Sequence, residues 1–384
     1  MKAPSRLRSL DALRGLAALS VVLFHWIFWL GDAHGLFRPG LTEHSLPAYE
    51  ALRFFYLSGD TAVSLFFSLS GFIFYWLYRD PIRSGLVRTK EFSVARLSRL
   101  YPLQLMSLLI VAGAQAAYAS VNQGLDWIFG PNDALHFMKH LLLFPLWAPH
   151  RDITFNVPDW TLAIEVLLYV IFFFVARWGS LRWGGTLLML AASAAVGSCY
   201  SQDIGRGMAC FYMGGVAYLI FERIESPQVD RILRILLGVS WPVAFVLGSG
   251  YIDIHRTRLA FLDGVYATYF LFPATILSLA LFETRRGGVS ARLQTIGDLS
   301  YSSYLLHFPL MVIVAFSLSA MHQSPDVMLG LPALAGFFAV LVPLSLVCHH
   351  KFERPMQSWL RSQLMPPARS AEDATTLHSE SAEV

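Results

Sequence analysis

Long apolar segments separated by short polar ones run along almost the whole chain. A helix needs about 20 mostly apolar residues to cross about 30 Å of hydrocarbon, where every backbone polar group must be satisfied within the helix. Ten segments meet this requirement: 10–30, 61–79, 101–120, 160–177, 184–200, 207–222, 233–250, 259–282, 297–320 and 329–348. The pattern therefore predicts an all-α integral membrane protein with about ten transmembrane helices. The segments 184–200 and 207–222 are short, so a re-entrant pair is the alternative there.

The basic residues between these segments predict how the chain is oriented. When the segments cross alternately, 22 of the 29 Lys and Arg residues fall on the side of the N-terminus and 7 on the other. Because cytoplasmic loops carry the excess of Lys and Arg, both termini are expected in the cytoplasm. Two outer loops are long, 31–60 and 121–159, and a short apolar stretch in the second, His136–Trp147, predicts a helix lying on the outer surface.

Composition supports the same class and excludes others. Hydrophobic residues make up 55% of the 384 residues and charged residues 14%, against about 25% charged in soluble domains. The formal net charge of +3 comes from clusters between apolar segments, which speaks against a nucleic-acid partner. We expect a multi-pass protein of the cell (inner) membrane, with a membrane domain at 1–356 and a disordered cytoplasmic tail at 357–384. No metal-ligand or phosphate-loop spacing occurs, so the sequence predicts neither a metal nor a bound cofactor.

The first apolar segment contains three ionisable residues, Asp11, Arg14 and His25. Such groups cost about 3 kcal/mol each in a lipid-facing helix, and helices keep them where they face a bundle interior. Arg14 and His25 are eleven residues apart and differ by roughly 20° around a helix, with Asp11 on the same side. We interpret this stripe as functional, although an Asp11–Arg14 ion pair with a structural His25 would also account for it.

Other polar residues also interrupt apolar segments. Glu165 lies one turn from both Thr161 and Tyr169, and Tyr304 and His307 share a face with Ser300. Arg96 and Arg99 open the third segment, where their planar guanidinium groups suit phosphate binding, although ordinary topology also accounts for them. Two further features have simpler interpretations: Glu353 and Arg354 form an end cap of the last segment, and the pair His349–His350 is too isolated to indicate a metal site.

Several motifs in order resemble the membrane acyltransferase-3 family. They are SLDALRGLAALSVVLFH, FFSLSGFIFYW, ARLSRLYPLQ, VPDWTLAIEVLLY, RGMACFYMGG, GDLSYSSYLLHFPL and FERP, and they span residues 7–356. The resemblance implies a ten-helix enzyme that moves an acyl group, commonly acetyl, from acyl-CoA to a hydroxyl of a surface polysaccharide or a smaller glycosylated compound. It also implies roles for individual residues. His25, Arg14 and Glu165 would be catalytic, and the substrate-binding residues would be Asp11, Arg96, Arg99, Trp160, Tyr301 and His307.

The chemistry of these side chains is compatible with acyl transfer. A hydroxyl that attacks a thioester needs a base near neutral pH, for which histidine is suited, and Arg14 can stabilise the oxyanion. Glu165 is the first candidate to hold the tautomer of His25. An acyl-histidine intermediate and direct transfer remain two open routes. The alternative from another class is a secondary transporter that uses the buried Arg, His and Glu as a relay. The acceptor, the acyl chain and the oligomeric state are not determined by the sequence.

Overall fold

The protein is a bundle of helices. The structure, a computed structural model, describes residues 7–31, 37–143, 154–250, 264–286, 288–290 and 292–365. Within these ranges there is no strand, and one isolated β-bridge joins Gly31 to Phe37. The first half contains α1 Arg8–His25, η1 Trp26–Leu30, η2 Glu43–Ser45, α2 Tyr49–Ser58, α3 Thr61–Leu77, α4 Arg79–Arg83, α5 Thr89–Val121, α6 Ala134–Leu141 and α7 Asp159–Trp178. The second half contains α8 Trp183–Cys199, α9 Gln202–Phe221, α10 Pro227–Gly248, η4 Ala267–Leu271, α12 Phe272–Arg286, α13 Arg292–Asp298, α14 Ser300–Ala320, η5 Pro325–Leu329, α15 Leu331–Cys348, η6 His349–Glu353 and α16 Arg354–Leu364.

The predicted fold class is confirmed. In the described ranges eight helices are long and apolar enough to cross a membrane, and α2 with α3, bent by 54°, makes a ninth if the pair counts as one span. The helix α8 is apolar but shorter, whereas α9 qualifies by itself. Large apolar side chains such as Leu188, Val239 and Val347 are exposed on the outside of the bundle, as lipid-facing positions require.

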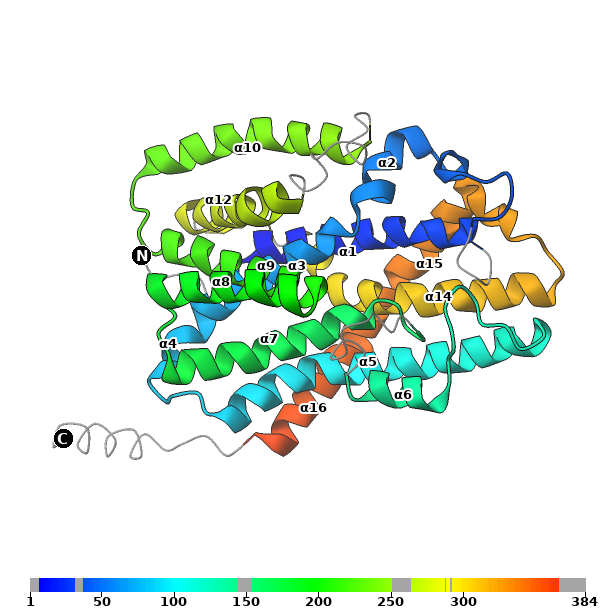
Figure 1. Ribbon diagram of the computed structural model, residues 1–384, viewed down its shortest axis with the longest axis horizontal. Helices are drawn as coiled ribbons and strands as arrows, with labels where there is room; N and C mark the ends of the chain where they lie inside the picture. Colours follow the sequence, from blue (N-terminus) through cyan, green and yellow to red (C-terminus); the bar gives the residue numbers. More distant parts are fainter. Residues whose placement is uncertain are drawn as a thin grey trace.

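The helices run mostly along the long axis of the molecule (Figure 1). Along this axis α14 packs against both α1 and α5, while α10 lies at the edge (Figure 1). The continuous element from α15 to α16 crosses α5 obliquely, and α16 packs against α5 (Figure 1). One end of the bundle carries α4, and α2 lies along the upper edge above α1 (Figure 1).

Glycines allow two pairs of helices to approach backbone to backbone. A Cβ atom on Gly71 of α3 would lie 1.8 Å from the carbonyl oxygen of Phe211 on α9, and one on Gly214 of α9 would lie 1.9 Å from that of Ser68. Gly15 of α1 meets Ile296 of α13 in the same way, at 1.9 Å. Small residues commonly permit such contacts in membranes, where no hydrophobic effect drives helices together.

Two predicted boundaries differ from the structure. The outer-surface helix expected at 136–147 is α6, which ends at Leu141, and residues 144–147 lie outside the described ranges. The tail expected from 357 begins inside α16, which continues to Leu364 and packs on α5, where Arg361 donates hydrogen bonds to Ser98 and to the Ala95 carbonyl. Residues 366–384 lie outside the described ranges, as do residues 1–6, so the sides of the two termini remain a prediction.

Candidate active site

A cavity of about 370 Å³ opens among α1, α3, α5, α7, α14 and α16. Its volume lies in the range of about 300–1,000 Å³ that is usual for small-molecule sites. The polar lining consists of Asp11, Arg14, Ser70, Arg96, Arg99, Thr161, Glu165, Tyr169, Asp298, Ser300, Tyr301, Tyr304, His349, Glu353, Arg354 and Gln357. The lining extends to the exposed side chain of Arg354, at the α16 end of the cavity. Six of the nine residues predicted from the sequence line this one cavity: Asp11, Arg14, Arg96, Arg99, Glu165 and Tyr301.

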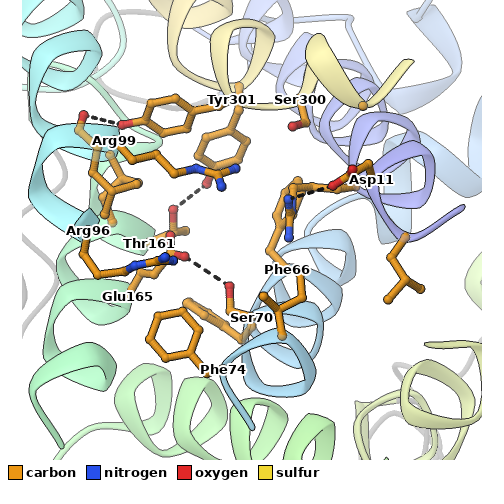
Figure 2. A pocket seen from close by; sticks show the side chains of 18 of the residues that line it. Asp11, Phe66, Ser70, Phe74, Arg96, Arg99, Thr161, Glu165, Ser300 and Tyr301 are labelled. Carbon is orange, nitrogen blue, oxygen red and sulfur yellow. Dashed lines mark hydrogen bonds and ion pairs between the residues drawn. The ribbon is translucent and has the colours of Figure 1, made fainter. Parts of the chain in front are cut away.

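The two arginines of α5 have different surroundings, although both reach into the cavity (Figure 2). Arg96 donates a hydrogen bond to the hydroxyl of Tyr78, and its guanidinium carbon lies 4.6 Å from the centre of that ring and 5.1 Å from that of Phe74. Arg99 makes no hydrogen bond or ion pair with any described residue. A cation that lines a cavity without an ion partner is a natural site for an anionic ligand group.

The start of α1 is held in place from another helix. The carboxylate of Glu283 on α12 accepts hydrogen bonds from the backbone N–H groups of Arg8 (2.9 Å) and Ser9 (2.8 Å) and from the Ser9 hydroxyl (2.6 Å). These contacts satisfy helix N-terminal donors that α1 has no side chain of its own to cap. They fix the turn that follows, where Arg14 lies 3.6 Å from Asp11 in an ion pair.

Glu165 lines the cavity and is not hydrogen-bonded to His25. Its carboxylate accepts hydrogen bonds from the hydroxyls of Ser70 (3.1 Å; Figure 2) and Tyr169. The expectation that Glu165 holds the tautomer of His25 is therefore wrong for this structure. The reason is packing: α7 presents Glu165 to α3 and α5, whereas His25 packs against α14.

A cluster of acidic residues and a histidine at the α16 end of the cavity was missed from the sequence. His349 lies 2.9 Å from a carboxylate oxygen of Glu353 and 3.5 Å from one of Asp298, and Glu353 also accepts a hydrogen bond from Ser302. Glu353 is buried and lines the cavity, so it is more than an end cap. The only sequence signal is the pairing of His349 with Glu353 four residues later, and the π-helical turn η6 brings both to the cavity.

The two remaining histidines of the predicted site form a buried pair outside the cavity lining. Nδ1 of His25 lies 2.7 Å from Nε2 of His307, and Nδ1 of His307 lies 3.1 Å from the carbonyl oxygen of Ser303. His25 is 7% exposed and His307 is 0% exposed. Both ring nitrogens of His307 are thus engaged within the protein, which leaves none for a substrate. The prediction that His307 binds substrate is not supported by this arrangement.

Tyr304 connects the cavity to the histidine pair. Its hydroxyl lies 2.8 Å from that of Thr161, both residues line the cavity, and its ring centre lies 6.2 Å from that of His307. Tyr301 lines the cavity as predicted and donates a hydrogen bond to the Leu100 carbonyl (2.5 Å). Trp160 does not line it, and the Arg206 guanidinium lies 5.9 Å from its ring centre. In the described part of the chain, no group of three His, Cys, Asp or Glu side chains is arranged to hold a metal ion.

Helices of membrane length, a charged internal cavity and a buried imidazole pair together define a polytopic membrane protein with an internal site. The chain belongs to the acyltransferase-3 family, whose acyltransferase domain matches residues 7–350. It is an acyltransferase, as the sequence motifs indicated, and a multi-pass membrane protein.

Three bacterial proteins are similar to this chain in sequence. The acyltransferase MdmB of Streptomyces mycarofaciens is 29% identical over 340 residues, which cover 79% of this chain and 78% of MdmB. BcsY of Komagataeibacter xylinus, whose name describes a membrane-bound transacylase, is 24% identical over 91% of this chain and 83% of BcsY. Protein 2 in the picA locus of Rhizobium radiobacter is 30% identical over 50% of this chain and 93% of that protein. No solved structure matches the chain significantly.

Proposed function

We propose that the protein is an O-acyltransferase of the inner membrane that takes an acyl group, acetyl in the simplest case, from acyl-CoA. The acceptor is a hydroxyl group on a cell-surface polysaccharide or another glycosylated compound. The observation that carries the donor half of this proposal is Arg99, a cation that lines the cavity without an ion pair among the described residues. In this proposal the diphosphate of a coenzyme A thioester is the ion partner of Arg99, because phosphate suits the planar guanidinium.

The surroundings of Arg99 support a donor that enters from the α16 end. Arg354 lines the same cavity, is exposed, and likewise has no ion pair in the described ranges. The acidic lining residues have partners: Asp11 pairs with Arg14, Glu165 bonds Ser70 and Tyr169, and Glu353 bonds Ser302. None of these carboxylates is hydrogen-bonded or ion-paired to Arg99 or Arg354 in the described ranges, so the guanidinium groups of both arginines can still bind phosphate.

The reaction itself needs a base or a nucleophile, and we assign that role to His25. In direct transfer, His25 takes the proton of the acceptor hydroxyl while the oxygen attacks the thioester carbonyl; the C–O bond forms, the C–S bond breaks, and the thiolate recovers a proton from the imidazolium. In the second route the imidazole attacks the thioester carbonyl first, the N–C bond forms and the C–S bond breaks. The acyl-histidine then passes the acyl group to the acceptor oxygen, whose proton goes to the thiolate. In both routes the acyl arm must extend from the cavity past Tyr304.

The experiment uses the purified protein in nanodiscs with acetyl-CoA and a polysaccharide or glycoside acceptor. We expect release of free thiol and acetyl ester formation on the acceptor, both lost in His25→Ala. The transporter alternative predicts the reverse in proteoliposomes: uptake of a solute without thiol release. Solute uptake without consumption of any acyl-CoA would overturn the proposed function.

A further inference from the structure

We propose that His307 is a positioning residue: it fixes His25 as the tautomer protonated at Nδ1 and so leaves Nε2 of His25 for the reaction. This inference rests on the proposed function for its catalytic meaning. It assigns His307 a role different from substrate binding, and it follows from hydrogen bonds alone.

The first step concerns His307 and the backbone of its own helix. A carbonyl oxygen can only accept a hydrogen bond, so Nδ1 of His307, 3.1 Å from the carbonyl of Ser303, must carry a proton. Neutral imidazole has one protonated nitrogen, and the other is an acceptor. In the neutral ring, Nε2 of His307 is therefore a lone pair. The contact is local to α14, between residues four apart.

The second step is that the tautomer of His307 determines the tautomer of His25. Since Nε2 of His307 accepts, Nδ1 of His25, 2.7 Å away, must donate. The ring planes differ by 15° and their centres are 5.0 Å apart, as expected for two imidazoles joined edge to edge by an N–H···N bond. With its proton on Nδ1, neutral His25 has its lone pair on Nε2. That atom makes no hydrogen bond with a described residue.

The surroundings of the pair make this fixation effective. His307 is fully buried and His25 nearly so, and the aromatic rings of Phe24, Phe28 and Tyr304 lie beside them. Neither histidine hydrogen-bonds a carboxylate in the described ranges. In many enzymes a carboxylate holds the tautomer of a catalytic histidine; here a second imidazole and a backbone carbonyl take that place.

The histidine pair also determines how the positive charge that forms on His25 is distributed during the reaction. When Nε2 of His25 gains the acceptor's proton, or an acyl group, the ring becomes cationic. The Nδ1–H···Nε2 bond then spreads the charge onto His307, whose Nδ1–H is held by the Ser303 carbonyl. In direct transfer the thiolate takes the proton from Nε2 of His25; in the acyl-histidine route the acceptor oxygen takes the acyl group and its proton ends on the thiolate. In both cases the two rings return to the starting tautomers, and no further protein group needs to gain or lose a proton.

The kinetic test compares two substitutions of His307. His307→Leu removes the acceptor and is expected to lower kcat by about 10²–10⁴-fold, the usual contribution of a positioned base. His307→Gln retains an acceptor oxygen and is expected to restore most of that loss. The KM for acetyl-CoA should stay within about threefold in both, because His307 does not line the cavity. Equal loss in both variants, or a rise in KM that matches the fall in kcat, would indicate a merely structural role.

The second measurement does not depend on activity. Protein labelled with ¹⁵N-histidine in nanodiscs is examined by NMR, and the signals are assigned with His25→Gln and His307→Gln. We expect His25 protonated at Nδ1 and unprotonated at Nε2, with the reverse tautomer of His25 increasing in His307→Leu. A wild-type His25 protonated at Nε2 overturns the inference even if acyl transfer is confirmed. The expected tautomer in a protein that consumes no acyl-CoA would instead refute the proposed function alone.

Discussion

The hydroxyls of Tyr304 and Thr161 lie 2.8 Å apart at the boundary between the arginine-lined cavity and the buried histidine pair. The ring of Tyr304 contributes to the cavity on one side and lies 6.2 Å from the ring of His307 on the other. In the proposed function, donor binding and chemistry are therefore separated in space. Substitutions on the two sides should change different kinetic constants.

Replacing His25 should remove catalysis and leave donor binding intact. His25→Ala is expected to abolish measurable acyl transfer, because no other imidazole has a ring nitrogen available at this position, while the Kd of a non-hydrolysable acyl-CoA analogue stays within about twofold. The variant should insert normally, since an apolar side chain lowers the cost of insertion. Acyl-transfer assays and analogue binding on the same preparation check both statements. Substantial transfer by a well-folded variant would exclude His25 from the mechanism.

Replacing Arg99 should weaken donor binding and leave catalysis nearly unchanged. Loss of a charge-assisted hydrogen bond costs about 1.5–3 kcal/mol, so Arg99→Ala should raise the KM for acetyl-CoA about ten- to hundredfold and change kcat little. Arg99→Lys keeps the charge and should recover part of the affinity. A large fall in kcat with unchanged KM would point instead to a role in the transition state.

Arg96 provides a comparison, because its side chain is hydrogen-bonded to Tyr78 as well as lining the cavity. Arg96→Ala removes the hydrogen bond to Tyr78 and the stacking against the rings of Tyr78 and Phe74. We expect this variant to unfold at a lower temperature than Arg99→Ala in nanodiscs, in addition to any rise in KM. Thermal unfolding of the two variants side by side checks the difference; equal stability would contradict the packing role.

Glu165 should influence the donor site and not the base. Its hydrogen bonds go to Ser70 and Tyr169, so Glu165→Gln should leave the pH dependence of kcat unchanged and alter the KM for acetyl-CoA by a few fold. Ser70→Ala is the matched control, since it removes one of the two donors without changing charge. A shifted pH profile in Glu165→Gln alone would show that the carboxylate acts on His25 after all.

The contact between α3 and α9 should be intolerant of a single methyl group. Gly71→Ala forces a Cβ to within 1.8 Å of the Phe211 carbonyl oxygen, and such overpacking costs about 1–3 kcal/mol. Gly113→Ala on α5 is the control, because no heavy atom lies within 4 Å of its Cβ position. We expect lower thermal stability only for the first variant. Equal unfolding temperatures would mean that α3 and α9 do not pack this closely.

The sequence predicted helices, spans and many cavity residues because these depend on local patterns. Hydropathy fixes where a helix crosses, and a charge inside an apolar segment must face the bundle interior, so Arg14, Arg99 and Glu165 could be found. Which helices meet is a tertiary property that periodicity does not contain. For that reason Glu165 was paired with His25, although α7 presents it to α3.

Residues whose positions or partners depend on the backbone itself are the hardest to predict from the sequence. His349 and Glu353 belong to the π-helical turn η6, whose register differs from the regular helix on which the sequence interpretation relied. The Ser303 carbonyl has no sequence signal, because every residue carries one. Its importance follows only from the ring nitrogen that lies 3.1 Å away.

The final prediction is that acyl transfer crosses the membrane, and it follows from positions along α1. Arg14 and His25 are eleven residues apart, or about 16 Å along the axis at 1.5 Å per residue, roughly half of a 30 Å hydrocarbon core. Arg14 lines the cavity that extends to Arg354, whereas His25 ends α1 and is followed by η1, whose Trp26 bonds the Met328 carbonyl in η5. The cavity and the histidine pair thus lie at different depths.

If the Arg-rich end is cytoplasmic, as the positive-inside rule predicts, acyl-CoA binds from inside and the acceptor meets His25 from the outer half. Sealed vesicles of known orientation, loaded with labelled acetyl-CoA on one side, test this. Acceptor supplied on the side opposite the donor should become labelled, and the label should disappear in His25→Ala. Lysed vesicles control for access, because they should label acceptor in either arrangement. Labelling only when donor and acceptor share the cytoplasmic side would defeat the prediction, even with His25 proven catalytic, because the separation along α1 would then have no role in transport of the acyl group.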